Sequence, residues 1–178
     1  MFNKYCLILI AASLFSTSAS AEQWTPNHWY IDGGFGSITF NDSVDTIHPK
    51  NIYIRGGYFI NQYFNVGLES NVTISPDQVA YAPGVDFSVN IGTLYLRAGA
   101  PVSDSVMLYG QIGSSNTELS AKYNGVTVTS SDSDTMLGAG AEIGLGSGST
   151  YLALNYSQYN NNSGVKVTGF NVGIGARF

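Results

Sequence analysis

Apolar and polar residues alternate with a period of two along most of this chain, and no other feature restricts its fold as strongly. Across residues 64–72 (FNVGLESNV), the even-numbered positions are mostly large and apolar, whereas the odd-numbered positions carry Asn, Gly, Glu and Asn. The last segment, 165–178, repeats the pattern, with apolar residues at the even positions from Phe170 to Phe178. A period of two places the two sets on opposite faces of a β-strand, so the alternation predicts an all-β protein.

Eight segments of this kind follow one another, and the connections between them alternate in length. The predicted strands are 29–41, 52–60, 64–72, 87–100, 106–115, 135–145, 150–159 and 165–178. The short turns are 61–63, 101–105 and 146–149, and the mostly longer, polar loops are 42–51, 73–86, 116–134 and 160–164. Short turns at one end and long loops at the other are typical of a bacterial outer-membrane barrel. A soluble lipocalin-like barrel or a β-sandwich is the alternative.

The charged residues of the strands decide between these alternatives. Six of them lie at membrane depth, three acids and three bases: Asp32, Arg55, Glu69, Arg97, Glu142 and Arg177. All six occupy the parity opposite the apolar one, and glycine crowds the same parity. A soluble barrel would carry many unbalanced Lys and Glu on its outer face, and a midplane base that faces lipid costs roughly 2–4 kcal/mol. The polar, glycine-rich face is therefore predicted to be the interior of an eight-stranded antiparallel up-and-down transmembrane β-barrel.

The composition agrees with this fold and excludes several other classes. Only 11% of the residues are charged, against about 25% in a soluble domain. Aromatic residues make up 13% and the net charge is -5, which argues against disorder. Twelve acids oppose seven bases without a basic cluster, which disfavours a nucleic-acid partner. The only cysteine is Cys6, so neither a disulfide scaffold, a metal site nor a cofactor is expected.

The N-terminal segment has the three parts of a secretory signal peptide. Lys4 precedes an apolar run of ten residues from Cys6 to Phe15, and an A-x-A cleavage pattern ends at Ala21. The run is too short for a membrane anchor, which needs ~20 residues. We therefore expect residues 1–21 to be removed on export and residues 22–178 to form the barrel domain.

Several segments resemble the small eight-stranded outer-membrane barrels, the family of the OmpA transmembrane domain and its OmpX-like relatives. Residues 29–36 (WYIDGGFG), 57–64 (GYFINQYF) and 138–145 (GAGAEIGL) are similar to the family's first strand, first periplasmic turn and sixth strand. Residues 96–102 and 108–113 are similar to the second periplasmic turn. The resemblance implies a monomeric barrel in the outer membrane of a Gram-negative bacterium, in contact with outer-membrane lipid and lipopolysaccharide.

The C-terminus also resembles the assembly signal of this family. Asn171, Gly173, Ala176 and Phe178 match the pattern that the barrel-assembly machinery reads, although a larger apolar residue is usual where Ala176 stands. The resemblance implies that this machinery and periplasmic chaperones are partners of the chain during biogenesis.

The resemblance further implies a pairing of interior charges. In the family, a glutamate of the sixth strand pairs across the interior with a base of the fourth, and these positions match Glu142 and Arg97. Two more pairs are expected, because an unpaired charge in a narrow lumen costs roughly 3–5 kcal/mol. The three predicted pairs are Arg97 with Glu142, Arg55 with Glu69, and Asp32 with Arg177.

An enzyme is one alternative function, because a few barrels of this size modify lipid A with a histidine and a serine. His28 lies beside Trp29 before the first strand and is expected to be an interfacial residue. His48 lies in the first external loop, and Asp77 and Ser75 lie in the second, where a nucleophile and a base could meet. A solvated loop histidine is the simpler interpretation, so we do not expect an enzyme.

A pore is a second alternative. Diffusion porins need roughly 16–18 strands, whereas eight strands leave an interior that side chains fill. Besides the six charges, five tyrosines are expected to point inward: Tyr30, Tyr95, Tyr109, Tyr151 and Tyr159. The lumen is therefore predicted to be plugged, and a small gated channel remains a lesser alternative.

The external loops suit a surface role. They contain two bases, Lys50 and Lys122, and seven acids: Asp42, Asp45, Asp77, Asp86, Glu118, Asp132 and Asp134. Such loops repel polyanions at low salt, but Tyr81, Tyr123 and the strand-like segment 126–128 suit a protein partner. We expect a structural outer-membrane barrel without an open pore, with a cell-surface interaction or envelope-integrity role. An adhesin or ligand-binding barrel is the main alternative, and a lipid A-modifying enzyme is a lesser one.

Overall fold

A computed structural model describes residues 28–42, 45–78, 82–145, 149–162 and 164–178. The predicted signal peptide lies outside the described residues. The strands are β1 (Trp29–Asn41), β2 (Thr46–Ile47), β3 (Lys50–Phe59), β4 (Phe64–Ser75), β5 (Asp86–Ser103), β6 (Val106–Tyr123), β7 (Val126–Gly144), β8 (Thr150–Asn162) and β9 (Val165–Arg177). Within these ranges, no helix has the length and hydropathy needed to cross a membrane.

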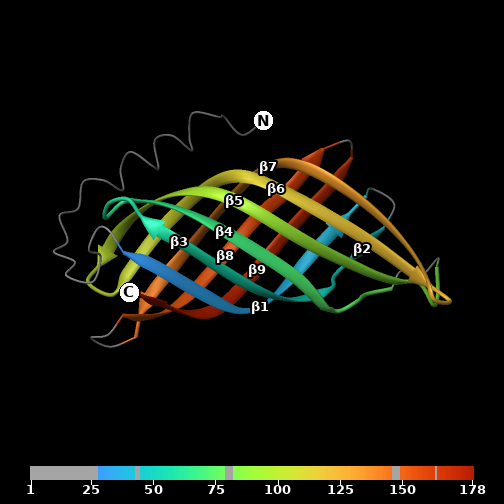
Figure 1. The fold of residues 1–178 in the computed structure, drawn as a ribbon, viewed down its shortest axis with the longest axis horizontal. Helices are drawn as coiled ribbons and strands as arrows, with labels where there is room; N and C mark the ends of the chain where they lie inside the picture. The colour runs from blue at the N-terminus through green and yellow to red at the C-terminus, as the bar shows by residue number, and fades with distance from the viewer. Residues whose placement is uncertain (1–27, 43–44, 79–81, 146–148, 163) are drawn as a thin grey trace.

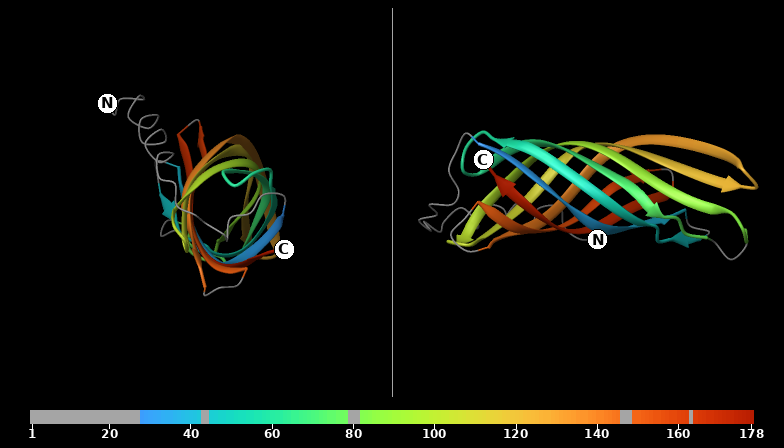
Figure 2. Two further views of the ribbon diagram at one scale, coloured as in Figure 1. Left: turned by 90° about the vertical axis from the view of Figure 1, so that its left-hand side faces the viewer. Right: turned by 60° about the horizontal axis from the view of Figure 1, so that its bottom comes forward.

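The eight long strands form one closed antiparallel sheet. Each pairs with its sequence neighbours, and β1 also pairs with β9 from Tyr30 opposite Arg177 to Asn41 opposite Lys166. The strands wind around a common axis, and the end-on view shows a closed ring (Figures 1 and 2). This arrangement confirms the predicted eight-stranded up-and-down barrel. The sequence did not predict β2, a two-residue strand that pairs with the end of β1.

Burial along the strands follows the predicted parity. In β4, the outward Leu68 is 64% exposed and the adjacent inward Glu69 is 3% exposed. The outward apolar side chains form the surface that faces lipid, and aromatic residues lie at its two borders. Trp29 and Tyr58 contact each other near the turns, with ring centroids 5.0 Å apart. Tyr156 and Phe170 pair across β8 and β9 nearer the loops.

The third external connection differs from its prediction. Residues 116–134 were expected to form a long loop, but β6 and β7 continue through them as a paired hairpin that ends at Asn124 and Gly125. Both turn residues have positive φ values, 46° and 81°, which a two-residue type I′ turn requires. The Asn-Gly dipeptide was therefore the sequence signal for this hairpin. The hairpin and the connection between β4 and β5 extend side by side at the loop end of the barrel (Figure 1), and Gly84 of that connection lies next to the Tyr123 ring.

Candidate functional site

The interior of the barrel holds all six of the predicted charged residues, in two clusters rather than three pairs. The six residues are between 0% and 6% exposed: Asp32, Arg55, Glu69, Arg97, Glu142 and Arg177. Inward positions of neighbouring strands bring them together at the end of the barrel nearer the short turns. The first cluster is built around Glu142 and the second around Arg55.

Glu142 of β7 binds two arginines. Arg97 Nη1 of β5 lies 2.6 Å from Glu142 Oε1, and Arg177 Nη2 of β9 lies 2.6 Å from Glu142 Oε2. The contact between Arg97 and Glu142 is the pair that the family resemblance implied. Each carboxylate oxygen receives its own charged donor, and such charge-assisted bonds offset the cost of removing the ions from water.

Arg55 of β3 binds acids on both of its neighbouring strands. Its Nη2 lies 3.0 Å from Asp32 Oδ1 and its Nε donates to Asp32 Oδ2 at 3.1 Å, a two-point contact. Its Nη1 lies 3.7 Å from Glu69 Oε2, so the predicted pair of Arg55 and Glu69 is present as the longer contact. Tyr151 also donates to Asp32 Oδ2 at 3.1 Å.

The predicted pair of Asp32 and Arg177 is wrong. Asp32 lies directly opposite Arg55 in the β1–β3 register, whereas Arg177 lies opposite Tyr30 in the β1–β9 register. Asp32 therefore takes the arginine beside it. Arg177 takes Glu142 on β7, which is not its neighbour in the sheet, because the narrow lumen brings non-adjacent strands within reach of a long side chain.

Tyrosines surround both clusters. The five predicted inward tyrosines are all buried, and Tyr53, which sequence reasoning missed, joins them at 4% exposed. The Tyr109 ring lies 3.9 Å from Arg97 Cζ and the Tyr151 ring lies 4.4 Å from Arg177 Cζ. An arginine over an aromatic ring gains cation–π attraction, which is strongest away from water. The arginines are thus held by rings as well as by carboxylates.

Inward glycines make room for these rings. A Cβ added at Gly140 would lie 2.4 Å from Tyr109 Oη, and one at Gly173 would lie 2.4 Å from Tyr53 Oη. No side chain fits under either hydroxyl. The glycine-rich parity read from the sequence is therefore the counterpart of the large side chains that reach in from other strands.

A layer of amides lies above the charges and was not predicted. Asn51 Nδ2 donates to Asn71 Oδ1 at 2.7 Å, and Asn171 Nδ2 donates to the same oxygen at 3.1 Å. Tyr159 Oη donates to Glu69 Oε1 at 2.6 Å and links this layer to the Arg55 cluster. The sequence signal for this layer was that Asn51, Asn71 and Asn171 all occupy inward positions of their strands.

Nearer the loops the interior becomes apolar, which corrects the expectation of a uniformly polar lumen. Eight buried residues form this apolar cluster: Ile38, Ile47, Val89, Ile91, Tyr95, Met136, Tyr159 and Val167. Ile47 comes from β2, so the first external connection places an apolar side chain over the barrel mouth. Inward residues are mostly polar and outward residues are mostly apolar at the turn-proximal ends of the strands, but this alternation does not extend to the loop-proximal positions.

The two histidines take no part in the ion pairs of the charge clusters. The His28 ring stacks on Phe59, with centroids 4.9 Å apart. His48 Nδ1 lies 3.1 Å from Thr39 Oγ1, whereas Asp77 Oδ2 accepts the backbone N–H of His48 at 2.6 Å. Asp77 therefore bonds the His48 backbone rather than its ring, so the described residues contain no Ser-His-Asp arrangement at this position.

Asp77 holds the first two external connections together. Backbone N–H groups of His48 and Gln78 donate to its carboxylate, and these bonds lower the pKa of Asp77 below its usual value of 3.8. Its backbone also bonds Phe87 in both directions. Among the described residues, no group of three or more His, Cys, Asp or Glu side chains is arranged to hold a metal ion.

The residues of the predicted assembly signal have different surroundings. The side chain of Asn171 belongs to the interior amide layer, and Gly173 underlies Tyr53. Ala176 lies opposite Ile31 across the β1–β9 seam. Phe178 is 72% exposed, and its backbone exchanges two hydrogen bonds of 2.9 Å with Trp29.

Comparisons with known proteins agree with this architecture. A family model described as "Outer membrane protein beta-barrel domain" matches residues 7–178. Among curated proteins, no sequence matches the chain.

Solved structures of outer-membrane proteins are similar in fold. Ail, the attachment invasion locus protein of Yersinia pestis, superposes with a TM-score of 0.67 at 17% identity, over 86% of this chain and 100% of Ail. Another Ail structure holds the heparin analogue sucrose octasulfate. Neisserial surface protein A has a TM-score of 0.67 at 16% identity, over 84% and 97% of the two chains. OprG of Pseudomonas aeruginosa has a TM-score of 0.59 at 13% identity, over 88% and 98%.

Proposed function

Because the chain belongs to the outer membrane protein β-barrel domain family, we propose that it is a structural barrel that acts at the cell surface by presenting its β6–β7 hairpin to a protein partner. The barrel wall lies in the outer membrane, and the hairpin extends away from it on the side of the long loops. In this proposal the interior clusters serve to make the barrel a rigid base, and the protein has neither an open pore nor a catalytic role.

One observation carries the proposal: the hairpin has an unpaired strand edge. β7 pairs with β6 from its first residue, but it pairs with β8 only from Leu137 onward. Along residues 126–131, no described strand bonds the other side of β7. The tip is also apolar, since Val126 and Val128 are 67% and 68% exposed. An exposed edge with apolar side chains is suited to binding an extended segment of another protein as an added strand.

The base of the hairpin is fixed, which gives the edge a defined position. Asp132 Oδ2 accepts a hydrogen bond from Asn160 Nδ2 at 2.9 Å, and Asp134 Oδ2 accepts one from the Asn161 backbone at 2.8 Å. These carboxylates join β7 to the end of β8 just above the point where the backbone pairing stops. The free edge is therefore limited to the outer part of the hairpin.

The charge of the surface favours a protein over a polyanion. Ail has been crystallised with a heparin analogue, but the loop side of this chain carries seven acids against three bases once Lys166 at the start of β9 is included. Such a surface repels sulfated chains at low salt. The attachment role in the name of Ail supports a surface interaction here, with a different class of ligand.

The test compares cells with and without the protein in a common outer-membrane host. Labelled serum and extracellular-matrix proteins are the probes, and labelled heparin is the polyanionic probe. We expect cells that express the protein to retain at least one protein probe above the empty cells and to retain no extra heparin. The proposal is wrong if the protein panel binds both kinds of cells equally.

A proline substitution tests the edge itself. In a two-residue hairpin, Val126 bonds Tyr123, so the alternate residues Thr127 and Thr129 direct their N–H groups toward the open edge. Thr129→Pro removes one such donor and keeps the β6–β7 bonds, and Thr129→Val is the matched control. We expect the proline variant to lose most of the binding and the valine variant to retain it. Equal binding by the two variants would exclude edge pairing.

We further propose that Phe178 acts in assembly rather than in the stability of the folded barrel. Its side chain is 72% exposed, whereas its backbone contributes the bonds to Trp29. Phe178→Ala should therefore lower the yield of the barrel in the outer membrane of cells and leave refolding into detergent unchanged. Normal yield in cells would contradict the proposed recognition by the assembly machinery. We also propose that Asn171, Gly173 and Ala176 belong to the recognised signal and that periplasmic chaperones bind the chain before assembly.

A further inference from the structure

A groove crosses the outer wall of the barrel over β1 and β3 to β7. It is open on its outer side and has a volume of about 1330 Å³. The apolar side chains that line it belong to the outward parity, among them Ile54, Leu68 and Leu94, which are 56%, 64% and 55% exposed. Arg55 and Glu69 also border the groove, but their side chains are buried inside the barrel. The groove is therefore a feature of the surface that faces the membrane.

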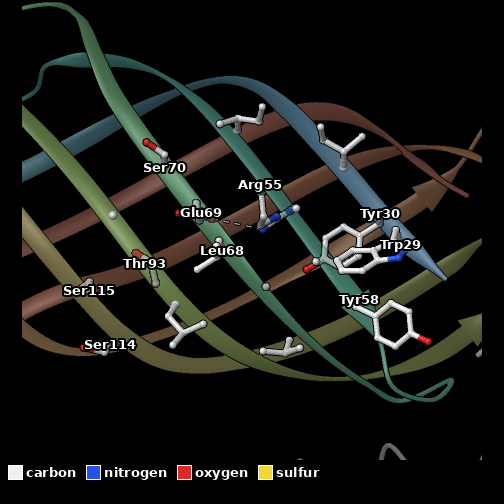
Figure 3. A pocket seen from close by; sticks show the side chains of 18 of the residues that line it. Trp29, Tyr30, Arg55, Tyr58, Leu68, Glu69, Ser70, Thr93, Ser114 and Ser115 are labelled. Atoms are coloured by element: carbon white, nitrogen blue, oxygen red, sulfur yellow. Dashed lines mark ion pairs between the residues drawn. The ribbon is translucent and has the colours of Figure 1, made fainter. Parts of the chain in front are cut away.

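The two ends of the groove differ in chemistry. Figure 3 shows Trp29 and Tyr58 at one end and Ser70 and Ser114 at the other, with Leu68 between them. The aromatic end lies beside the short turns, at the border of the apolar surface. The serine end lies on the side of the external loops, at the base of the hairpin.

The serine end continues as a row of outward polar or small residues. Ser70 lies opposite Gly92, Gly92 lies opposite Asn116, and Asn116 lies opposite Ser133 in the successive strand registers. All four are exposed. Asn116 Nδ2 donates to Ser133 Oγ at 3.0 Å, so one amide hydrogen and several oxygens of the row remain available to a ligand.

Gly92 lacks a structural reason to be glycine. A Cβ added there would meet no atom within 4 Å, and its φ lies outside the left-handed region. This contrasts with the inward glycines, which underlie tyrosine rings. Glycine weakens the interior of a strand, where it often marks a bulge, a tight bend or the close approach of a backbone or a ligand. The register at Gly92 is regular on both sides and no backbone atom lies close to the added Cβ, which leaves room for a ligand.

We propose that this groove binds one lipid of the outer leaflet, with an acyl chain along Leu68 and Leu94 and with hydroxyl and amide groups of the lipid at Ser114, Asn116 and Ser133. The occupant is a lipid because the groove is continuous with the lipid-facing surface of an outer-membrane barrel. No lysine or arginine side chain of the described residues projects into it. The lipid is therefore held through uncharged hydrogen-bonding groups, as a glycolipid with amide-linked chains offers, rather than through phosphate.

The proposal is tested with the refolded protein in detergent micelles by native mass spectrometry. The two probes are lipid A, which carries amide-linked hydroxyacyl chains, and phosphatidylethanolamine, which lacks them. We expect one lipid A molecule to be retained at concentrations where phosphatidylethanolamine is not. Added salt should have little effect on this binding, because ion pairs do not hold the lipid.

Gly92→Leu fills the polar end of the groove and is the main variant. We expect it to weaken lipid A binding about tenfold, which corresponds to about 1.4 kcal/mol. Ala139→Leu is the matched control, because Ala139 is exposed on the outward face of β7 but does not line the groove. Ser70→Leu is a second filling variant, to be used if Gly92→Leu does not refold.

The outcomes separate the proposal from general contact with lipid. Unchanged binding in both filling variants, or an equal loss in Ala139→Leu, would overturn the groove as the site. If the protein retains lipid A and phosphatidylethanolamine equally, and Gly92→Leu weakens the binding of both, the polar row does not recognise the hydroxyl and amide groups of lipid A. None of these results depends on the surface function proposed for the hairpin.

Discussion

The two halves of the barrel interior are filled by opposite kinds of side chain. The turn-proximal half contains Glu142 with its two arginines, Arg55 with its two acids, and the tyrosines that lie outside the apolar cluster, namely Tyr30, Tyr53, Tyr109 and Tyr151. The loop-proximal half contains the apolar cluster that includes Ile47 and Met136. Ion pairs need partners at defined positions, whereas apolar packing tolerates exchanges that conserve volume. The difference predicts that a single substitution is more damaging in the charged half.

The largest effect is expected for Glu142→Gln. This change removes the carboxylate that both Arg97 and Arg177 bind, and breaking such buried ion pairs costs about 3–5 kcal/mol. Arg97→Met should cost less, because Glu142 then retains Arg177. Urea unfolding in lipid vesicles measures both free energies.

The triple variant is the control for this prediction. Replacing Arg97 and Arg177 by Met together with Glu142→Gln removes every charge of the cluster and should recover most of the lost stability. The double variant of Arg97 and Glu142 should recover less, because Arg177 stays charged and has lost its 2.6 Å contact with Glu142. Full recovery in the double variant would show that Arg177 does not depend on Glu142.

A smaller effect is expected in the apolar half. Met136 is 0% exposed within the apolar cluster, so Met136→Ala leaves a cavity. The cost should be about 2–3 kcal/mol, in the lower part of the usual range because the cluster lies near the open end of the barrel. Urea unfolding at low and high salt checks this value, which should not change with salt. A cost above that of Glu142→Gln would reverse the comparison between the halves.

Conductance tests whether the two halves seal the lumen independently. Glu142→Gln breaks the ion pairs of the charged half alone and Met136→Ala leaves a cavity in the apolar half alone, so neither should raise the baseline conductance of a planar bilayer. The combined variant should give the first measurable increase. A channel in either single variant would mean that one half alone closes the barrel.

The smallest effect concerns the connection above the apolar cluster. The pKa of Asp77 is lowered because its carboxylate accepts the backbone N–H groups of His48 and Gln78. A lowered pKa stabilises the folded loop above the unfolded pKa of 3.8, and the gain is lost as the pH falls through the folded value. The protection of the His48 amide against exchange, relative to its intrinsic rate at each pH, should therefore be high at neutral pH and fall as Asp77 becomes protonated.

Asp77→Asn is the control for this pH effect. Its amide retains an acceptor for the His48 N–H but cannot titrate in this range. Amide exchange of His48 in this variant, corrected for the intrinsic pH dependence of exchange, should show no step near pH 4. The unfolding free energy of the barrel should stay almost unchanged in either case, because the contact lies in exposed loops.

The sequence by itself determined the strands, their inward and outward faces, and the closed barrel. The predicted segment 29–41 coincides with β1, and the register that places Arg55 opposite Glu69 is present. These features are local, because a period of two and the length of a turn are set by neighbouring residues. The pairing of Arg97 with Glu142 came from the family resemblance and needed no structure.

The tertiary structure alone decided which distant groups meet. Arg177 binds Glu142 rather than Asp32 because the tilted, closed sheet brings inward side chains of non-adjacent strands together, and no spacing along the chain records that distance. The same closure gathers Ile47, Met136 and Val167 into one apolar cluster. It also aligns Ser70, Gly92 and Asn116 in one row across three strands. Each of these contacts depends on the stagger between strands, which becomes fixed only when the barrel closes.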